Sequence, residues 1–293
     1  MARIMPIGAA LALSANGLFS LPAFAQPDTA QTFQPTSAWN VDYAEDSCAL
    51  QRSFANGSDE ISLDIRAYQW GNFFEVTVAG LTVSPTAEKI RFRIEPGGTF
   101  SEARNGRLLT SDKWQAVRFS GRLEPSVRQD GATSDLAEPE QTSREESMSG
   151  LRIDGTGSGE VLLQTGPLSQ PMDALRVCVD DLLTGLGLDP APQRSLSRSL
   201  KPRDQMTLAR KTQEGLPREV LKEAWRGRAD IRIIVGPLGR PSSCGALGSS
   251  RETAFGKYAC EMAMRYARFD PALDASGEPV ASVYVTSITY SGD

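Results

Sequence analysis

The first half of the chain contains short runs in which apolar and polar residues alternate, and this period of two predicts β-strands. Residues 131–150 are acidic and almost without apolar positions, so we expect a mobile surface loop there. Gly, Asn and Pro separate the predicted strands, which lie at 47–54, 61–68, 73–80, 89–94, 115–121 and 160–166. This part of the chain is therefore expected to be mostly β.

The pattern changes at 171–187, where apolar residues recur three and four positions apart and predict a helix. Pro171 suits the first helical position, and Gly185 or Gly187 can end the helix. The apolar positions that share one face are Leu175, Cys178, Leu182 and Leu186. We expect this helix to close a mostly-β domain that spans residues 26–189.

Residues 215–293 predict a small α+β domain. Ser249 followed by Glu252 is a capping box, and it predicts the start of a helix that ends before Asp270-Pro271. The expected elements, in order, are a helix at 216–225, strands at 229–235 and 242–247, the capped helix, and a strand at 280–290. This α-β-β-α-β order predicts a three-stranded antiparallel sheet with a helix packed on it.

Charge separates these two regions from the segment between them. Residues 26–189 contain 14 Lys and Arg against 25 Asp and Glu, whereas 190–214 contain 6 against 2 and 215–293 contain 10 against 9. The segment 190–214 is rich in Pro, Ser and Arg with little apolar periodicity, so we expect a basic linker that trypsin cuts first. The chain as a whole is acidic, which argues against a nucleic-acid partner.

The N-terminus has the features of a secretory leader. Arg3 precedes an apolar stretch, and Ala23-Phe24-Ala25 places small residues where a signal peptidase reads. We expect residues 1–25 to be a signal peptide cleaved after Ala25, which would leave a soluble periplasmic protein. The alternative is an uncleaved membrane anchor, although the apolar run is shorter than the ~20 residues that usually span a bilayer.

The cysteine and histidine content restricts the chemistry. The four cysteines form no Cys-x-x-Cys, and the chain has no histidine, which disfavours a zinc site and removes the usual general base. We expect no catalytic, metal or cofactor site. In an exported chain an even number of cysteines predicts disulfides. Cys48 in the first predicted strand and Cys178 on the apolar helix face would join the start of the domain to its end.

The C-terminal residues also resemble a known family. The matching positions are Leu216-Pro217, Gly239-Arg240, Cys244, Ser249-Ser250, Cys260, Ala267-Arg268-Phe269, Pro271-Ala272 and the stretch from Asp274 to Val280. In this order and spacing they resemble the C-terminal domain of TonB-type energy transducers, in a cysteine-containing form. The resemblance covers about 215–293, and residues 26–189 resemble no family that we can name.

The resemblance implies a way of binding. TonB-type domains bind an extended peptide of an outer-membrane receptor by adding it as a strand to the edge of their sheet. The candidate edge is the last strand, in which Val283 and Val285 are expected on one face and Tyr284, Ile288 and Tyr290 on the other. A standard transducer also has an uncleaved membrane helix with a histidine and a long Pro-rich spacer. This sequence has no histidine and no such spacer, and we expect its leader to be cleaved.

The division into domains also bears on the remaining cysteines. Four cysteines allow three pairings, and only Cys48–Cys178 with Cys244–Cys260 keeps each bond within one domain. Cys244 lies on a predicted strand, and Cys260 lies on the helix expected to pack over it.

Three kinds of function remain open. The favoured one is an exported, non-catalytic TonB-like protein that binds an envelope protein or an outer-membrane receptor segment. The alternatives are a TonB-type energy transducer, if the leader is an uncleaved anchor, and an enzyme of unknown class without histidine chemistry. A structural envelope component is a further alternative.

Overall fold

The computed structural model describes residues 30–80, 90–97, 100–110, 115–123, 127–129, 132–134, 138–155, 159–223, 226–250 and 253–291. The expected signal peptide at 1–25, with its cleavage site after Ala25, lies outside these residues. Among the helices of the described ranges, none has both the length and the apolar character needed to cross a membrane.

The alternating runs of the N-terminal part pair into one large sheet. Within the described residues its order is β7-β6-β12-β13-β1-β3-β4-β5-β9-β8, with β2 paired to β3. The pairings are antiparallel except for β1 with β13, which is parallel. Its strands are β1 (Gln31–Pro35), β2 (Asn40–Tyr43), β3 (Cys48–Asn56), β4 (Asp59–Ala67), β5 (Phe73–Ala79), β6 (Arg91–Glu95), β7 (Ser101–Glu102), β8 (Arg104–Thr110), β9 (Gln115–Arg122), β12 (Gly150–Asp154) and β13 (Val161–Leu163). A separate hairpin joins β10 (Val127–Gln129) to β11 (Ala132–Ser134). The expectation of a sheet-rich N-terminal part is confirmed.

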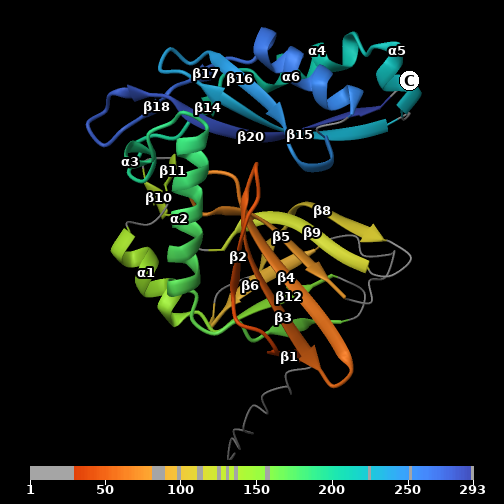
Figure 1. Cartoon of the computed structure of the whole chain (residues 1–293), viewed down its shortest axis with the longest axis vertical. Helices are drawn as coiled ribbons and strands as arrows, with labels where there is room; N and C mark the ends of the chain where they lie inside the picture. Colours follow the sequence, from red (N-terminus) through yellow and green to blue (C-terminus); the bar gives the residue numbers. More distant parts are fainter. Residues whose placement is uncertain are drawn as a thin grey trace, which may run out of the picture.

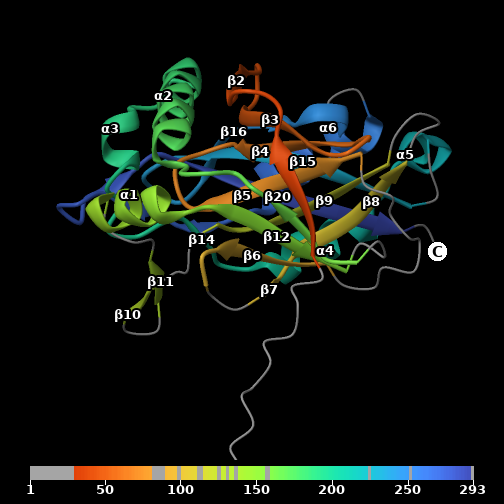
Figure 2. The same ribbon diagram turned by 90° about the horizontal axis from the view of Figure 1, so that it is seen from below.

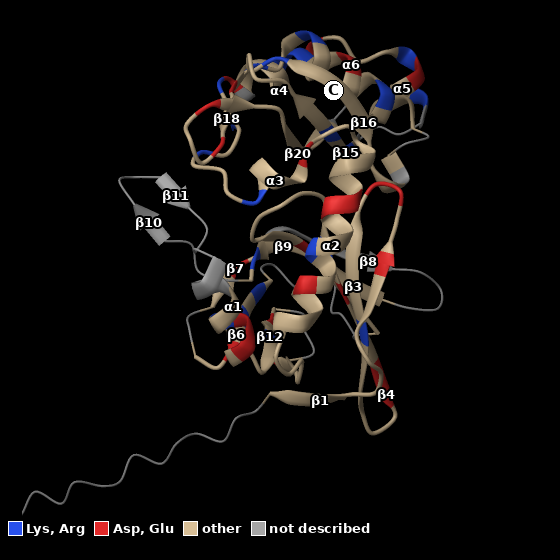
Figure 3. Cartoon of the chain, turned by 60° about the vertical axis from the view of Figure 1, so that its left-hand side comes forward, with Lys and Arg blue, Asp and Glu red and all other residues tan. Residues whose placement is uncertain are grey.

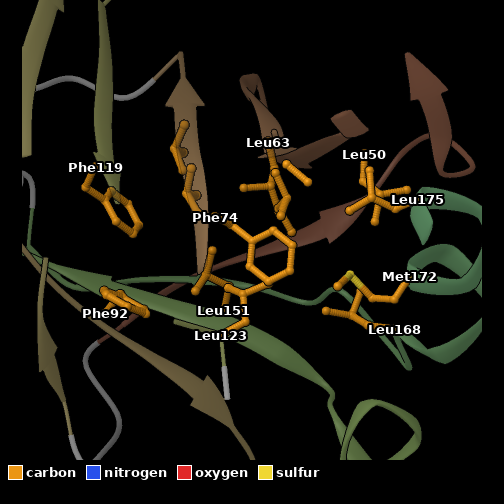
Figure 4. Close-up of a cluster of buried hydrophobic side chains, with 14 of the residues drawn as sticks. Leu50, Leu63, Phe74, Phe92, Phe119, Leu123, Leu151, Leu168, Met172 and Leu175 are labelled. Atoms are coloured by element: carbon orange, nitrogen blue, oxygen red, sulfur yellow. The ribbon is translucent and has the colours of Figure 1, made fainter. Parts of the chain in front are cut away.

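The large sheet curves so that distant strands face each other across a core (Figure 4). Phe92 of β6 packs on Phe119 of β9, with ring centroids 5.1 Å apart. Gly121 permits this approach, because a Cβ there would lie only 2.3 Å from the Phe92 ring. Helix α2 (Ser169–Gly185) closes the other end of the core with Met172 and Leu175. Each such side chain stabilises the fold by about 1.5–3 kcal/mol when fully buried.

The observed bounds of helix α2 are close to the predicted ones, 171–187. It begins at Ser169, two residues before Pro171, so Pro171 is in the first turn and not at its first position. It ends at Gly185, and Gly187 takes a φ of +75°, a left-handed conformation that favours glycine. Cys178 of α2 is bonded to Cys48 of β3, with a Cα–Cα distance of 5.9 Å.

The expected mobile loop at 131–150 was a wrong prediction, because much of it is helix α1 (Glu138–Ser147). The helix lacks an apolar stripe, and tertiary contacts hold it. Glu145 is buried and pairs with Arg176 of α2, and Met148 just beyond the helix is also buried. An acidic residue thus supplies a contact that the pattern of apolar positions could not reveal.

The expected linker at 190–214 also differs from the structure, because it is folded. It contains α3 (Pro190–Gln193), β14 (Lys201–Pro202) and α4 (Gln205–Glu214). Asp189 and Asp204 cap the two helices through side-chain oxygens. Two leucines of this segment, Leu200 and Leu208, pack against the C-terminal core. A few well-placed side chains were enough to fold a segment that has little periodicity.

The C-terminal part is a three-stranded sheet with helices on one face (Figure 1). The strand order is β16-β15-β20, both pairings are antiparallel, and α6 packs on β15 and β16. Cys244 of β16 is bonded to Cys260 of α6, with a Cα–Cα distance of 5.4 Å. The elements are α5 (Arg218–Glu223), β15 (Arg226–Val235), β16 (Pro241–Ala246), the short 3-10 helix η1 (Gly248–Ser250), α6 (Ala254–Tyr266), β17 (Phe269–Asp270), β18 (Ala272–Leu273), β19 (Pro279–Val280) and β20 (Ser282–Ser291).

The predicted capping box at Ser249 and Glu252 does not start α6. Ser249 lies in η1, and Glu252 is outside the described residues. The N-cap is Thr253, whose hydroxyl accepts a hydrogen bond from the Gly256 N–H at 2.9 Å. The local chain satisfies the same helix N-terminus with a threonine four residues further on.

The second face of the C-terminal sheet lies against the N-terminal part (Figures 1 and 2). Val283 of β20 is only 4% exposed and belongs to the N-terminal hydrophobic core, and Ile234 of β15 packs against that core. Asp46, between β2 and β3, accepts hydrogen bonds from Arg232 and from the Gly248 N–H. The three-stranded sheet is therefore covered on both faces.

Candidate partner-binding edge

Strand β20 is at the end of the sheet order, so one side of its main chain has no strand beside it among the described residues. In an antiparallel sheet successive residues direct their N–H and C=O groups to alternate sides. Asp230 of β15 directs both groups away from β20, since its C=O accepts from the Leu247 N–H and its N–H donates to Ser250 Oγ. Asp230 is aligned with Ser287. The main chain of Ser287 therefore points outward from the sheet.

The same alternation turns the main chain of Val283 and Val285 outward. Within the described ranges, no group donates to or accepts from these outward N–H and C=O groups. We call Val283, Val285 and Ser287 the open edge. Unpaired main-chain groups of this kind are a template for another strand.

Two glutamine side chains limit the open edge. Gln193 of α3 donates through Nε2 to the Ala281 carbonyl at 2.8 Å and accepts from Ser282 Oγ at 2.6 Å. At the other end, Gln213 of α4 donates through Nε2 to the Thr289 carbonyl at 2.7 Å. The open edge is thus a short segment between two occupied carbonyls.

The structure places the five expected edge residues on two faces. Val283 and Val285 face the N-terminal part, and Tyr284, Ile288 and Tyr290 face the core beneath α6. Tyr290 packs on Phe255 with ring centroids 3.9 Å apart, and Tyr284 packs edge-on against Phe269 at 5.0 Å. These side chains mainly stabilise the strand, so the groups that β20 leaves for pairing with another strand are main-chain groups.

A pocket of about 230 Å³ lies beside the open edge, on the face that carries α4 and α6. We call it the edge pocket. Its walls include Leu208, Ala209, Arg268, Phe269, Tyr284 and Ile288, and Thr286 lies between the last two along β20. The edge pocket therefore joins β20 to α4 and to the segment between α6 and β17.

Two charged side chains of opposite sign line the edge pocket. Asp204 caps α4 and accepts from the N–H and the hydroxyl of Thr207; these bonds hold the pKa of Asp204 below its ordinary value. Arg268 donates to the carbonyl of its neighbour Ala267, and no carboxylate within the described residues pairs with it. Because Thr207 is neutral, Asp204 keeps its negative charge, and the two charged groups differ only in their hydrogen bonding: Asp204 already accepts two bonds, whereas Arg268 donates to one carbonyl among the described residues.

Sequence reasoning missed Gln193, Gln213 and all of α4. A signal for α4 was present, because Asp204 followed by Thr207 is a capping pattern, and Leu208 and Thr212 recur at helical spacing. No comparable signal identifies a glutamine that will cap a distant strand, since that role depends on the packing of α3 and α4.

Neither metal chemistry nor a charged patch is evident in the part of the chain that the structure describes. No group of three or more His, Cys, Asp or Glu side chains there could hold a metal ion. Basic and acidic residues lie side by side on α4, α5 and α6 (Figure 3). The features that can act on a partner are the open edge and the edge pocket.

One family model matches the chain, over residues 213–291, and it is described as "Gram-negative bacterial TonB protein C-terminal". The match confirms the TonB-like character expected of the C-terminal region, and it ends at the last residue of β20. No family model covers the residues before 213, which include most of α4. No curated protein matches the chain.

Proposed function

We propose, from the match of residues 213–291 to the TonB C-terminal family, that this is an exported, non-catalytic TonB-like protein. It binds an envelope protein by adding an extended segment of that protein to β20. The observation that supports this proposal is the open edge, whose outward main-chain groups have no partner among the described residues. Strand addition needs only such groups for affinity and adjacent pockets for specificity.

The proposal includes a cellular location and a role. TonB C-terminal domains belong to the periplasmic side of the Gram-negative envelope, so we propose a periplasmic protein whose leader is cleaved after Ala25. A second candidate, an energy transducer, is favoured by the same family match. The N-terminus of the protein isolated from cells separates the two: a start at Gln26 supports the soluble form, and retention of Met1 supports the anchored transducer.

A proline substitution tests strand addition directly. Val285→Pro removes an outward N–H and leaves the hydrogen bonds from β20 to β15 in place, because residue 285 does not donate to β15. Val285→Ala is the matched control, since it shortens the same side chain and retains the N–H. Cross-linked capture from native envelopes should give a partner that the alanine variant retains and the proline variant loses. Equal capture by both variants would refute strand addition at β20.

A further inference from the structure

The edge pocket lies where a strand added to β20 would place a side chain. Residues aligned across two paired strands point to the same face of the sheet. Thr286, which lies between Val285 and Ser287, shares its face with Tyr284 and Ile288, which line the pocket. The partner residue aligned with Thr286 therefore points toward the edge pocket.

The size and walls of the pocket indicate what that side chain is. A cavity of about 150 Å³ lined by aliphatic and aromatic residues can hold a benzene molecule, and the edge pocket is larger, at about 230 Å³. Phe269 and Tyr284 line it in an edge-on pair, and such rings favour a third ring in tilted contact. A phenyl-sized ring fits both observations.

The hydrogen-bonding state of the two charged side chains adds a second preference. Arg268 lines it without a carboxylate partner in the described residues, whereas the Asp204 carboxylate is occupied by Thr207. A guanidinium that lacks a counter-ion favours a carboxylate on the segment that binds beside it.

We infer that the edge pocket selects, for strand addition, an extended peptide segment with an aromatic side chain aligned with Thr286 and an acidic residue within two positions of it. The inference rests on the proposed function and specifies the partner that the same site accepts. It also assigns a role to α4, because Asp204, Leu208 and Ala209 precede residue 213, where the family match begins. Helix α4 thus supplies one wall of the edge pocket.

Two capped hexapeptides test the inference on the full-length protein. Thr-Val-Phe-Val-Glu-Thr and Thr-Val-Ala-Val-Glu-Thr differ only in the ring, and titrations followed by amide NMR give their dissociation constants. We expect the phenylalanine peptide to bind about tenfold more tightly, as expected when one aromatic ring is buried. Binding should protect the amides of Val285 and Ser287 from hydrogen exchange.

Two variants separate the pocket from the edge. Ala209 is exposed on α4, so Ala209→Trp can fill the pocket without disturbing the core. This variant should bind the phenylalanine peptide no more tightly than the alanine peptide. A third peptide, Thr-Val-Phe-Val-Gln-Thr, should bind the unmodified protein more weakly than the peptide with Glu; Arg268→Gln should abolish this difference and retain the preference for the ring. Unchanged melting temperatures would show that both variants fold.

The outcomes are distinguishable. Equal affinities of the two peptides, with protection of Val285 and Ser287, would overturn the pocket inference and leave strand addition intact. Absence of binding, or binding without protection of these amides, would overturn both. Concentration-dependent dimers whose open-edge amides are protected without peptide would identify a second copy of the chain as the occupant and overturn the inference.

Discussion

At the scale of single residues, Glu95 at the end of β6 shows how a half-buried carboxylate is stabilised in the N-terminal sheet. It accepts hydrogen bonds from Arg93, from Arg152 Nε at 2.7 Å and from the Gly97 N–H at 3.1 Å. Burial disfavours the ionised carboxylate, but these donors outweigh burial and lower the pKa of Glu95. The ionised form of Glu95 therefore stabilises the fold.

We expect Glu95→Gln to lower the free energy of unfolding by about 2 kcal/mol at pH 7. This loss is smaller than that from breaking a fully buried ion pair, because Glu95 is partly exposed. The folded pKa lies below the unfolded value of about 4.3, so this contribution is present above that value and disappears as the pH falls through the folded pKa. Urea unfolding of both proteins at pH 7 and pH 3.5 should show the difference shrinking. The exposed Glu146→Gln is the control, and a gap that stays constant would contradict the assignment.

The role of Glu95 could not be read from the sequence. Its partner Arg152 is far along the chain and reaches it only because β6 pairs with β12. The alternation of apolar residues predicts which side chains are buried, whereas long-range strand pairing decides which charges meet. For the same reason, the sequence could not predict that Gln193 and Gln213 bind carbonyls of β20.

At the scale of secondary-structure elements, the two disulfides join a strand to a helix in each part of the molecule. Cys48–Cys178 spans 130 residues and Cys244–Cys260 spans 16. In the chain-entropy account a cross-link stabilises by restricting the unfolded chain, more so for a longer loop. The two bonds should therefore contribute unequally.

Replacing Cys48 and Cys178 together by serine should lower the free energy of unfolding by about 5 kcal/mol. The double replacement avoids leaving an unpaired buried thiol. The matched variant, with serine at Cys244 and Cys260, should lose about 3 kcal/mol. Guanidinium unfolding measures both losses, and non-reducing peptide mapping checks the bonds. A larger loss for the second pair, or a peptide linking Cys48 to Cys244, would refute this account.

Several strands could be predicted from the sequence, because apolar and polar residues alternate along most of their length. Expected strands at 47–54, 61–68 and 229–235 correspond to β3, β4 and β15. Short or polar elements were missed, among them β1, β2, β8, β12, α1, α3 and α4. Caps and contacts with distant elements stabilise α1 and α4, and neither leaves a periodic apolar pattern. The edge strand was therefore predictable, and its pocket was not, because α4 forms one wall.

At the scale of the whole molecule, the segment 190–214 connects two packed parts through specific contacts. Arg194 pairs with Asp180 of α2 and lies over the Trp70 ring, and Trp70 donates to the same carboxylate. Arg198 donates to the Pro271 carbonyl, and Arg203 pairs with Asp270. Basic side chains that suggested an open tether instead hold the segment in place.

Trypsin should consequently cut at Arg194 more slowly than it would in an unfolded linker, because a protease needs an extended, accessible chain. Asp180→Ala removes the carboxylate that holds Arg194 and should increase cleavage there several-fold. Asp181→Ala on the same helix is the control. Timed digestion with mass spectrometry measures the rates; rapid cleavage of the unmodified protein at Arg194 would mean that the segment is open in solution.

The two glutamines that limit the open edge also bear on colloidal behaviour. A long bare strand invites copies of the same protein to stack edge to edge, which is how fibrils grow. Here Gln193 and Gln213 occupy carbonyls at both ends, and between these carbonyls, in the described part of β20, Val283, Val285 and Ser287 present outward groups. Such a short stretch supports few intermolecular hydrogen bonds, so the protein can keep a strand accessible to a partner at high local concentration without precipitating.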